Sequence, residues 1–239
     1  MLRTSELYNQ HLSELSNQDK LLISTINAHC YNKAQVDSYY REALLNSDVL
    51  IPDGIGVILA VRWLTGTKLK KIAGADLFFY EMARLQKMGG KCFFLGSRDD
   101  ILNKIEERAA KEYPSVIIQT YSPPFKKEFE EEDVNAMIEA INQFQPDVLM
   151  VGMTAPKQEK WAYKNYDRLN VGHICCIGAV FDFYAGNVRR APQWMINTGL
   201  EWAFRFIKEP KRLWKRYLIG NFVFLWYVLN EKIGIKHLK

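Results

Sequence analysis

The sequence predicts an α/β fold in which helices cover both faces of a mostly parallel sheet. Short apolar runs alternate with amphipathic stretches of helical length from residue 20 to residue 181, and this order is typical of repeated strand–helix units. The apolar runs are nearly continuous, as expected for strands that are buried on both faces. With 239 residues, 48% of them hydrophobic, the chain can bury such a core without disulfides.

The expected strands are the apolar runs themselves. The clearest is Lys-Cys-Phe-Phe-Leu-Gly at 91–96, and the longest is the run from His173 to Phe181. Both are short enough for strands, because most strands span three to ten residues. The six expected strands cover residues 20–27, 48–51, 91–96, 116–121, 147–152 and 173–181.

The expected helices follow these strands and carry start signals. Pro52-Asp53-Gly54 turns the chain into one helix, and Ser97 with two acids opens another, where negative charge suits the helix dipole. Such alternation predicts a Rossmann-like core. The expected helices cover residues 31–46, 54–65, 74–88, about 98–112, 130–144 and 157–168.

Cysteine and histidine usage predicts a protein with no metal site and no disulfides. None of the four cysteines has a Cys-x-x-Cys or Cys/His metal spacing, so we expect reduced thiols. The four histidines are scattered and have no acidic metal motif beside them. The N-terminal segment is polar and has no apolar signal region, so secretion is not expected. These residues are Cys30, Cys92, Cys175, Cys176, His11, His29, His173 and His237.

Candidate ligand residues follow the expected strands. In open parallel sheets, ligands bind beyond the carboxyl ends of the strands. Polar residues gather in these places: Asn27-Ala28-His29, Pro52-Asp53-Gly54, Gly96-Ser97, Thr154 to Gln158, and Asp182.

Asp53 has two interpretations that are compatible with each other. It can cap the following helix through the free backbone N–H groups, or it can present a carboxylate at the ligand edge that accepts a proton. The adjacent Gly54-Ile55-Gly56 is too short for a dinucleotide fingerprint, because Leu59 stands where a third glycine is needed. A nicotinamide-dependent oxidoreductase is therefore disfavoured, and no P-loop is present.

Gln158 and Asp182 also have structural and functional interpretations. Gln158 can be an exposed residue in the first turn of a helix, or it can help a helix N-terminus to bind a diphosphate. Asp182 can simply end an apolar strand, or it can accept hydrogen bonds from a sugar or a base.

The last 39 residues differ sharply from the rest of the chain. Residues 201–239 hold nine Lys/Arg and three Asp/Glu, whereas residues 1–200 hold 23 and 24. Nine aromatic residues lie in the same segment. The sequence therefore predicts an α/β core over residues 1–200 and a basic, aromatic helical appendage over residues 201–239.

A helical wheel over 201–217 separates the charged residues of the appendage from its apolar ones. Pro210 is expected to kink or restart this helix. Basic residues beside aromatic faces are typical of interfacial helices on anionic lipid. The alternative is that this helix packs on the protein's own core.

The apolar run 217–229 is too short to span a bilayer. Nucleic acid is not an expected partner, because the remainder of the chain is slightly acidic. The basic face holds Arg205, Lys208, Arg212, Lys215 and Arg216.

Seven motifs, in this order, resemble one known family. They are PDGIGV, GADLF, LGS, APKQEKW, GAVFDFYAG, RAPQW and LEWAFRFIKEPKRLWKRY. The chain resembles the WecG/TagA/CpsF bacterial glycosyltransferases, and the resemblance runs from about Leu21 to Tyr217.

This resemblance implies a sugar transfer at the cytoplasmic face of the cell membrane. The donor would be a UDP-sugar and the acceptor a saccharide linked to polyprenyl diphosphate. The implied reaction inverts the anomeric centre and uses no metal or other cofactor. Its products would enter teichoic acid, capsule, exopolysaccharide or common-antigen synthesis. The donor sugar and the choice between a monomer and a homo-oligomer stay open.

The resemblance also assigns roles to individual residues. It places the catalytic base at Asp53 and pocket residues at Thr25 and the nearby Asn27. Gln158 and Asp182 would lie near the nucleotide, and the appendage arginines Arg205, Arg212 and Arg216 would close over the diphosphate and help the appendage to dock on the membrane.

Two positions depart from the family pattern. Lys71 stands where arginine is usual, which keeps the positive charge but loses the bidentate geometry on a phosphate. Thr154 stands where glycine is common, and this change can reshape the donor pocket. A protein that binds a nucleotide-sugar or a membrane surface without turnover stays the alternative, and only turnover separates the two.

Overall fold

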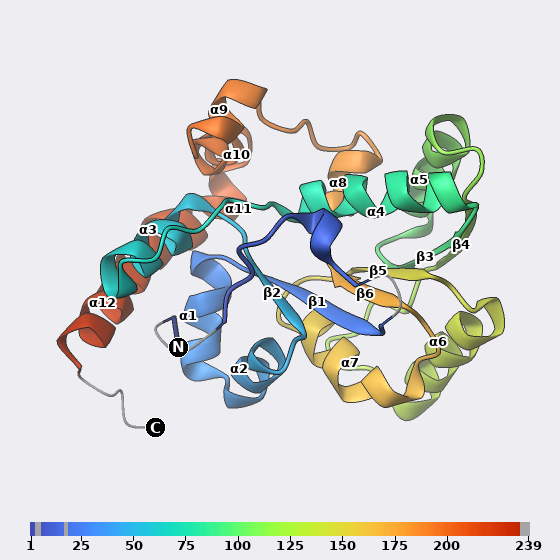
Figure 1. Ribbon diagram of the computed structural model, residues 1–239, viewed down its shortest axis with the longest axis horizontal. Coiled ribbons are helices and arrows are strands. Elements are labelled where there is room, and N and C mark those ends of the chain that lie inside the picture. Colours follow the sequence, from blue (N-terminus) through green and yellow to red (C-terminus); the bar gives the residue numbers. More distant parts are fainter. Residues whose placement is uncertain (3–5, 17–18, 235–239) are drawn as a thin grey trace.

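The computed structural model describes residues 1–2, 6–16 and 19–234 and confirms the α/β fold. Six strands form one parallel sheet in the order β2-β1-β6-β5-β3-β4 (Figure 1). All carboxyl ends therefore meet at one edge of the sheet. The strands are β1 Leu21–Ile26, β2 Val49–Pro52, β3 Lys91–Gly96, β4 Ile117–Tyr121, β5 Val148–Gly152 and β6 His173–Cys176.

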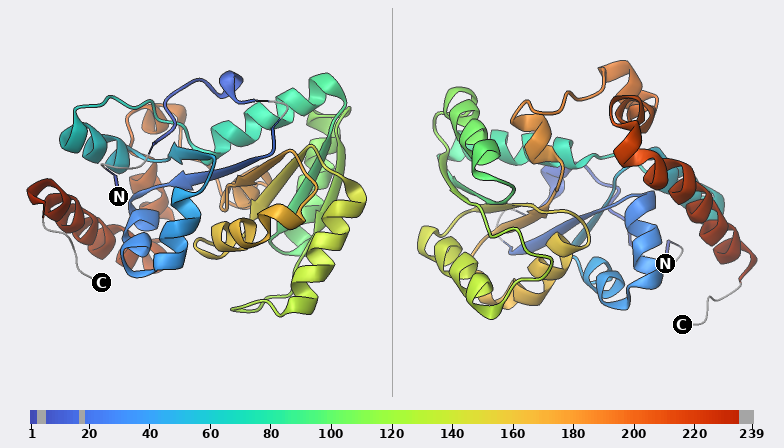
Figure 2. Two further views of the ribbon diagram at one scale, coloured as in Figure 1. Left: turned by 60° about the horizontal axis from the view of Figure 1, so that its bottom comes forward. Right: turned by 180° about the vertical axis from the view of Figure 1, so that it is seen from behind.

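Helices cover both faces of this sheet (Figures 1 and 2). Helices α4 (Gly74–Met88), α5 (Asp99–Glu112) and α8 (Val180–Tyr184) pack on one face, and α6 (Glu131–Phe144) and α7 (Lys157–Asn165) pack on the other. A third apolar cluster lies beside β2 and β1. It joins α1 (Ala28–Val36), α2 (Ser38–Leu45), α3 (Ile55–Thr65) and α12 (Gly220–Ile233).

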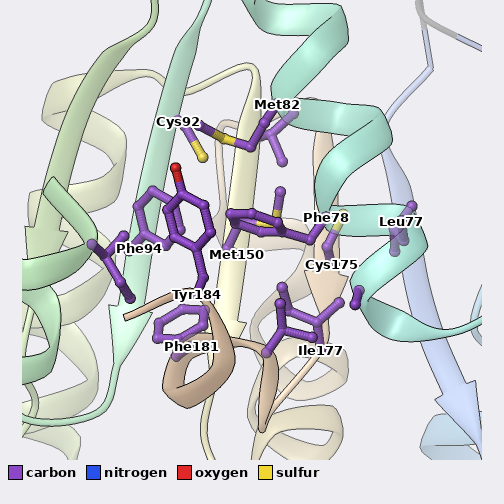
Figure 3. Close-up of a cluster of buried hydrophobic side chains, with 14 of the residues drawn as sticks. Leu77, Phe78, Met82, Cys92, Phe94, Met150, Cys175, Ile177, Phe181 and Tyr184 are labelled. Atoms are coloured by element: carbon purple, nitrogen blue, oxygen red, sulfur yellow. The ribbon is translucent and has the colours of Figure 1, made fainter. Parts of the chain in front are cut away.

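The strand sequences explain why both faces are covered. In β3, Cys92 and Phe94 pack into the cluster with α4 and α8 (Figure 3), whereas Phe93 and Leu95 pack against α6 and α7. Adjacent strand residues point to opposite faces, so an all-apolar strand requires helices on both sides. The four cysteines are all buried and free.

The structure corrects the bounds of two expected elements. The helix expected over 31–46 is two helices, because Asp37 ends α1 and its side chain accepts a hydrogen bond from Tyr40 N, at 2.9 Å, to cap α2. The strand expected over 173–181 ends at Cys176. Gly178 takes a left-handed φ of 49° and turns the chain into α8, where Phe181 remains buried against the sheet.

The C-terminal helices continue from the core without a separate apolar core of their own. After α9 (Gln193–Asn197) come α10 (Glu201–Lys208), α11 (Pro210–Trp214) and a π-helical segment, Lys215–Ile219, that leads into α12. Pro210 restarts the helix, as expected. Residues 235–239, including His237, lie outside the described residues. The boundary at residue 200 stays a prediction.

Helix α12 is anchored to α1 by aromatic and polar contacts. The Tyr31 ring meets the Phe224 ring edge-on at 5.3 Å, and the Tyr31 hydroxyl donates to Glu231 Oε2 at 2.6 Å. Asn32 Nδ2 donates to Gly220 O at 2.7 Å. These contacts hold α12 beside the carboxyl ends of β1 and β2. Within the described ranges, no helix combines the length and hydropathy needed to cross a bilayer.

Phe224 and Phe222 give a matched test of this packing. Phe224 is 5% exposed and Phe222 is 75% exposed on the same helix. We expect Phe224→Ala to lower the free energy of unfolding by about 3 kcal/mol, because it leaves a cavity against Tyr31. Phe222→Ala should change it by less than about 0.5 kcal/mol. Urea unfolding followed by circular dichroism measures both, and equal effects would contradict the packing.

Candidate active site

A cavity of about 750 Å³ opens where the three neighbouring strands β2, β1 and β6 end. The segments that follow these strands form its floor, and α10, the π-helical segment and α12 close over it. The site thus joins the sheet edge to the C-terminal helices. Its polar lining consists of Asn27, His29, Asp53, Lys71, Arg190, Glu201, Arg205, Arg216, Tyr217 and Asn221.

Asp53 lies at the end of β2 with an unpartnered side chain. Its backbone N–H donates to Ile26 O at 2.9 Å, which continues the pairing with β1. The N-cap of α3 is Gly54, at a φ of 111°, and no side chain caps it. The helix-cap interpretation of Asp53 is therefore wrong. Among the described residues, none donates a hydrogen bond to its carboxylate or pairs with it.

The surroundings of Asp53 make it a stronger base than an ordinary aspartate. Burial raises the pKa of the Asp53 carboxyl to about 6, and the nearby Glu201 and Asp76 carboxylates add to this rise. Lys71 and Arg205 act in the opposite direction. Because burial is the largest cause, the carboxylate is poorly solvated. It stays ionised at neutral pH and can accept a proton.

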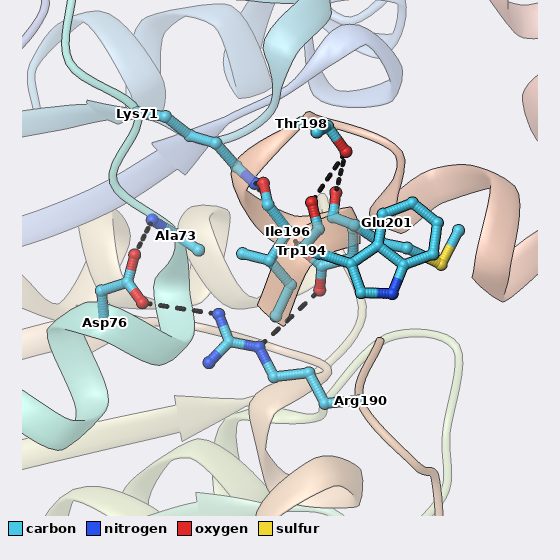
Figure 4. A network of polar contacts seen from close by, with 9 residues as sticks. Lys71, Ala73, Asp76, Arg190, Trp194, Ile196, Thr198 and Glu201 are labelled. Carbon is cyan, nitrogen blue, oxygen red and sulfur yellow. Dashed lines mark hydrogen bonds and ion pairs between the residues drawn. The ribbon is translucent and has the colours of Figure 1, made fainter. Parts of the chain in front are cut away.

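A network of charged residues around Lys71, Arg190 and Glu201 lines the same cavity (Figure 4). Lys71 Nζ donates to Ile196 O at 2.9 Å and lies 3.8 Å from Glu201 Oε2. Arg190 lies 3.9 Å from the other Glu201 oxygen and 3.4 Å from Asp76 Oδ1. The network links the loop before α4 to α9 and α10. It holds Lys71 and Arg190 in the cavity wall, and Asp53 takes no part in these ion pairs.

Arg205 and Arg216 bring unpaired positive charge into the cavity. The Nε atoms of both are buried and have no hydrogen-bond partner among the described residues. The Arg205 guanidinium lies over the Phe183 ring at 5.2 Å, and that of Arg216 lies 5.8 Å from the Tyr217 ring. Buried guanidinium N–H groups usually find an acceptor. An anionic ligand would supply one here.

Asn27 and His29 line the side of the cavity nearest α1. Asn27 Oδ1 caps α1 by accepting from His29 N and Cys30 N, at 3.0 and 3.1 Å. Burial, together with Arg216 and Lys33, lowers the pKa of the His29 imidazole to about 4. His29 is thus neutral at physiological pH, next to the Arg216 charge.

Four expected ligand residues do not line this cavity. Thr25 is buried within β1, opposite Ile51. Asp182 lies in the first turn of α8, because the chain leaves the sheet earlier than expected. The Arg212 side chain is 63% exposed and pairs with Glu209.

Gln158, the fourth, is buried at the start of α7 and donates to Glu159 Oε1 at 2.8 Å. Its Oε1 has no partner among the described residues and points towards Gly178. Burial raises the pKa of Glu159 to about 7. The exposed first-turn interpretation of Gln158 is wrong. A role for these four residues in binding stays a prediction.

The phase of the appendage helices explains why Arg216 reaches the cavity and Arg212 does not. Pro210 starts a new helix after Glu209, and the π-helical turn that follows holds an extra residue. A helical wheel drawn without a break across 201–217 therefore misplaces Arg212.

Within the described ranges, no group of three or more His, Cys, Asp or Glu is arranged to hold a metal ion.

Comparison with known proteins identifies the family. The model of the glycosyl transferase WecG/TagA/CpsF family matches residues 1–238. The chain belongs to this family. It is a glycosyltransferase, and the predicted membership is confirmed.

Two relatives from Bacillus carry the same name, N-acetylglucosaminyldiphosphoundecaprenol N-acetyl-beta-D-mannosaminyltransferase. The Bacillus subtilis (strain 168) protein is 35% identical over 199 residues, which cover 82% of this chain and 75% of the relative. The protein of Bacillus spizizenii (strain ATCC 23059 / NRRL B-14472 / W23) is 29% identical over 196 residues, which cover 82% and 74%.

Sequence reasoning missed several residues of this glycosyltransferase's cavity. His29 falls within Asn27-Ala28-His29, where polar ligand residues are expected, but no individual role is predicted for it. Arg190 belongs to the RAPQW motif and Glu201 to the tail motif, but neither received a role. Only the packing of the C-terminal helices shows that these residues meet.

Asp53→Asn should stabilise the folded enzyme near neutral pH. The pKa of Asp53 is about 6 in the folded chain and about 3.9 when unfolded. The folded state therefore loses stability as pH rises through this window, and removing the charge restores up to about 3 kcal/mol at pH 7.5. The gain should shrink to about 0.5 kcal/mol at pH 4.

Urea unfolding at both pH values measures this gain. Glu107→Gln is a suitable control, because Glu107 is exposed in the middle of α5. A destabilised Asp53→Asn variant, or a gain that does not depend on pH, would contradict burial of the carboxylate.

Proposed function

We propose that this enzyme transfers an N-acetylmannosamine-type sugar from a UDP-sugar to N-acetylglucosamine linked to polyprenyl diphosphate. The names of the two Bacillus relatives support the acceptor and the sugar. One observation carries the proposal: the Asp53 carboxylate and the buried Nε atoms of Arg205 and Arg216 have no partner among the described residues, and all three side chains line one cavity. The product would enter the synthesis of a cell-surface polysaccharide.

Asp53 acts as the general base in the proposed reaction. A hydroxyl oxygen of the acceptor attacks the anomeric carbon of the donor, and its proton passes to the Asp53 carboxylate. The new carbon–oxygen bond forms on the face opposite the diphosphate, whose own bond to that carbon breaks. The configuration inverts, and UDP leaves with the electron pair. The raised pKa of Asp53 favours this proton transfer.

Cations from the C-terminal helices stabilise the charge that develops. The leaving diphosphate gains negative charge as its bond breaks, and fixed donors aimed at that charge lower the barrier. Arg205 is placed for this work, and Arg216 and Lys71 add positive charge to the lining of the same cavity. Asn27 and His29 border the same space. In this proposal, side chains supply the neutralising charge that a metal ion provides in other transferases.

The C-terminal helices also place the enzyme at the membrane surface in this proposal. Large apolar side chains are exposed along them, and Lys208, Lys211 and Lys215 lie among these side chains. Such a mixture favours the interface of an anionic bilayer. Residence on the inner face of the cell membrane follows from the lipid-linked acceptor. These exposed side chains include Trp194, Ile207, Trp214, Leu218, Ile219, Phe222 and Trp226.

Acceptor-dependent UDP release tests the proposed activity. Purified enzyme is supplied with N-acetylglucosamine diphosphate lipid and one UDP-sugar at a time, including UDP-N-acetylmannosamine. Release with that donor alone supports the proposal, while release with another UDP-sugar corrects the donor. Binding of UDP-sugars without release from any of them would favour a protein that binds without turnover.

Asp53→Asn should lower kcat by about a thousandfold, because the amide cannot accept the proton. In the wild-type enzyme, kcat/KM should rise as pH increases through about 6, where Asp53 loses its proton. Steady-state assays from pH 5 to pH 8.5 measure both, with Glu107→Gln as the control. A wild-type profile that is flat through pH 6 would exclude Asp53 as the titrating base.

The three arginines of the appendage should differ in their effects. Arg205→Gln and Arg216→Gln each remove a guanidinium from the cavity and should lower kcat/KM by about a hundredfold. Arg212→Gln removes the same charge from the exposed side of the appendage and should lower it by less than about threefold. Equal losses in all three variants would show that the overall charge of the appendage matters, and not the cavity.

A further inference from the structure

The cavity extends beyond its charged part into an apolar groove between α3 and α12. Beyond Gly56 and Phe224, its lining side chains are all apolar. The α3 side contributes Leu59, Ala60 and Trp63, and the α12 side contributes Leu225, Val228 and Leu229. We name these six residues the apolar groove.

The groove is built by one face of each helix. The lining positions of both helices recur at intervals of three or four residues, which is the spacing of a single helical face. Phe224 lies beside Gly56, and Lys232 Nζ donates to Trp63 O at 2.8 Å. The two helices therefore run parallel and side by side (Figures 1 and 2). From Gly56 to Trp63, the rise along α3 is about 10 Å.

The groove is open to the surface. Leu59 is 55% exposed, Trp63 50%, Leu225 61% and Leu229 42%. A contiguous apolar surface of this kind is unfavourable in water and usually marks a binding site. The exposed Phe222 and Trp226 lie on the same helix, so the groove opens on the surface that we propose faces the membrane.

The position of the charged residues identifies the kind of occupant. Arg216, Tyr217 and Asn221 line the cavity just before the apolar lining of α12 begins, and His29 faces them from α1. A ligand that fills both parts needs an anionic head next to a hydrocarbon chain. A prenyl diphosphate has this form.

We propose that the apolar groove binds the first isoprene units of the acceptor, with the acceptor's diphosphate beside Arg216. This inference rests on the proposed function, because it assumes a lipid-linked acceptor. The groove then selects acceptors by their lipid and aligns the sugar hydroxyl with Asp53. Helix α12 thus forms part of the acceptor site as well as of the membrane-facing surface.

Two matched pairs of substitutions in the appendage test the groove. Leu225→Ser/Leu229→Ser alters the groove lining. Leu218→Ser/Phe222→Ser removes exposed apolar side chains at the same spacing, outside the cavity. Both pairs lower the hydrophobicity of the appendage to a similar extent. Only the first pair should affect binding in the groove.

Farnesyl diphosphate serves as a probe that needs no turnover. Its binding is followed by tryptophan fluorescence, because Trp63 and Trp202 line the cavity, and inorganic diphosphate is titrated in parallel. The groove variant should raise the Kd for farnesyl diphosphate at least about tenfold, since apolar contact is lost. Its Kd for inorganic diphosphate should stay within about twofold, and the control variant should resemble the wild type in both.

Two results would overturn the proposal. One is an unchanged Kd for farnesyl diphosphate in the groove variant. The other is an equal loss in the control variant, which would indicate a general effect of the membrane-facing surface. Sugar transfer is assayed separately. If no UDP-sugar is turned over while the binding difference persists, the proposed function fails and the prenyl-binding groove stands.

Discussion

The packing of α12 against α1 and α3 is the contact on which the site depends. The edge-on contact of Tyr31 and Phe224, with the Tyr31–Glu231 hydrogen bond, fixes α12 beside the carboxyl ends of β1 and β2. Without it, Asp53 would face open solvent, and neither Arg216 nor the apolar groove would border it. The cavity is therefore a product of core and appendage together.

This arrangement buries the Asp53 carboxylate, which destabilises the free protein and also makes Asp53 a stronger base. The Asp53 carboxylate has no hydrogen-bond partner among the described residues, and its pKa is raised mainly by desolvation. Arg205 and Arg216 also lack partners for buried N–H groups within the described part of the chain. Unpaired groups of opposite charge in one cavity destabilise the free protein. A substrate that offers a hydroxyl to the carboxylate and a diphosphate to the guanidiniums supplies the missing partners. An active site is expected to hold such unpartnered groups, whereas a stable core is not.

The sequence predicted the parallel sheet and most helices, because strand and helix periodicities are local properties of the chain. It missed two local events. Asp37 divides the helix expected over 31–46 into two by capping α2, and Gly178 turns the chain away from the sheet before Asp182. At the site, Asp53 could be found from its place after a strand. Arg190 and Glu201 could not, since their meeting with Lys71 depends on how α9 and α10 return across the sheet edge.

The central claim is that the core's carboxylate and the appendage's guanidinium share one electrostatic environment. The pKa of Asp53 measured by carboxyl ¹³C NMR tests this most directly, in the wild type and in Arg205→Gln. We predict a wild-type pKa of about 6 and a small upward shift in the variant, because Arg205 favours the ionised form but acts on Asp53 less than burial, Glu201 and Lys71 do. A wild-type pKa of about 4 that does not change in Arg205→Gln would show that Asp53 is solvated and that the appendage does not close over it.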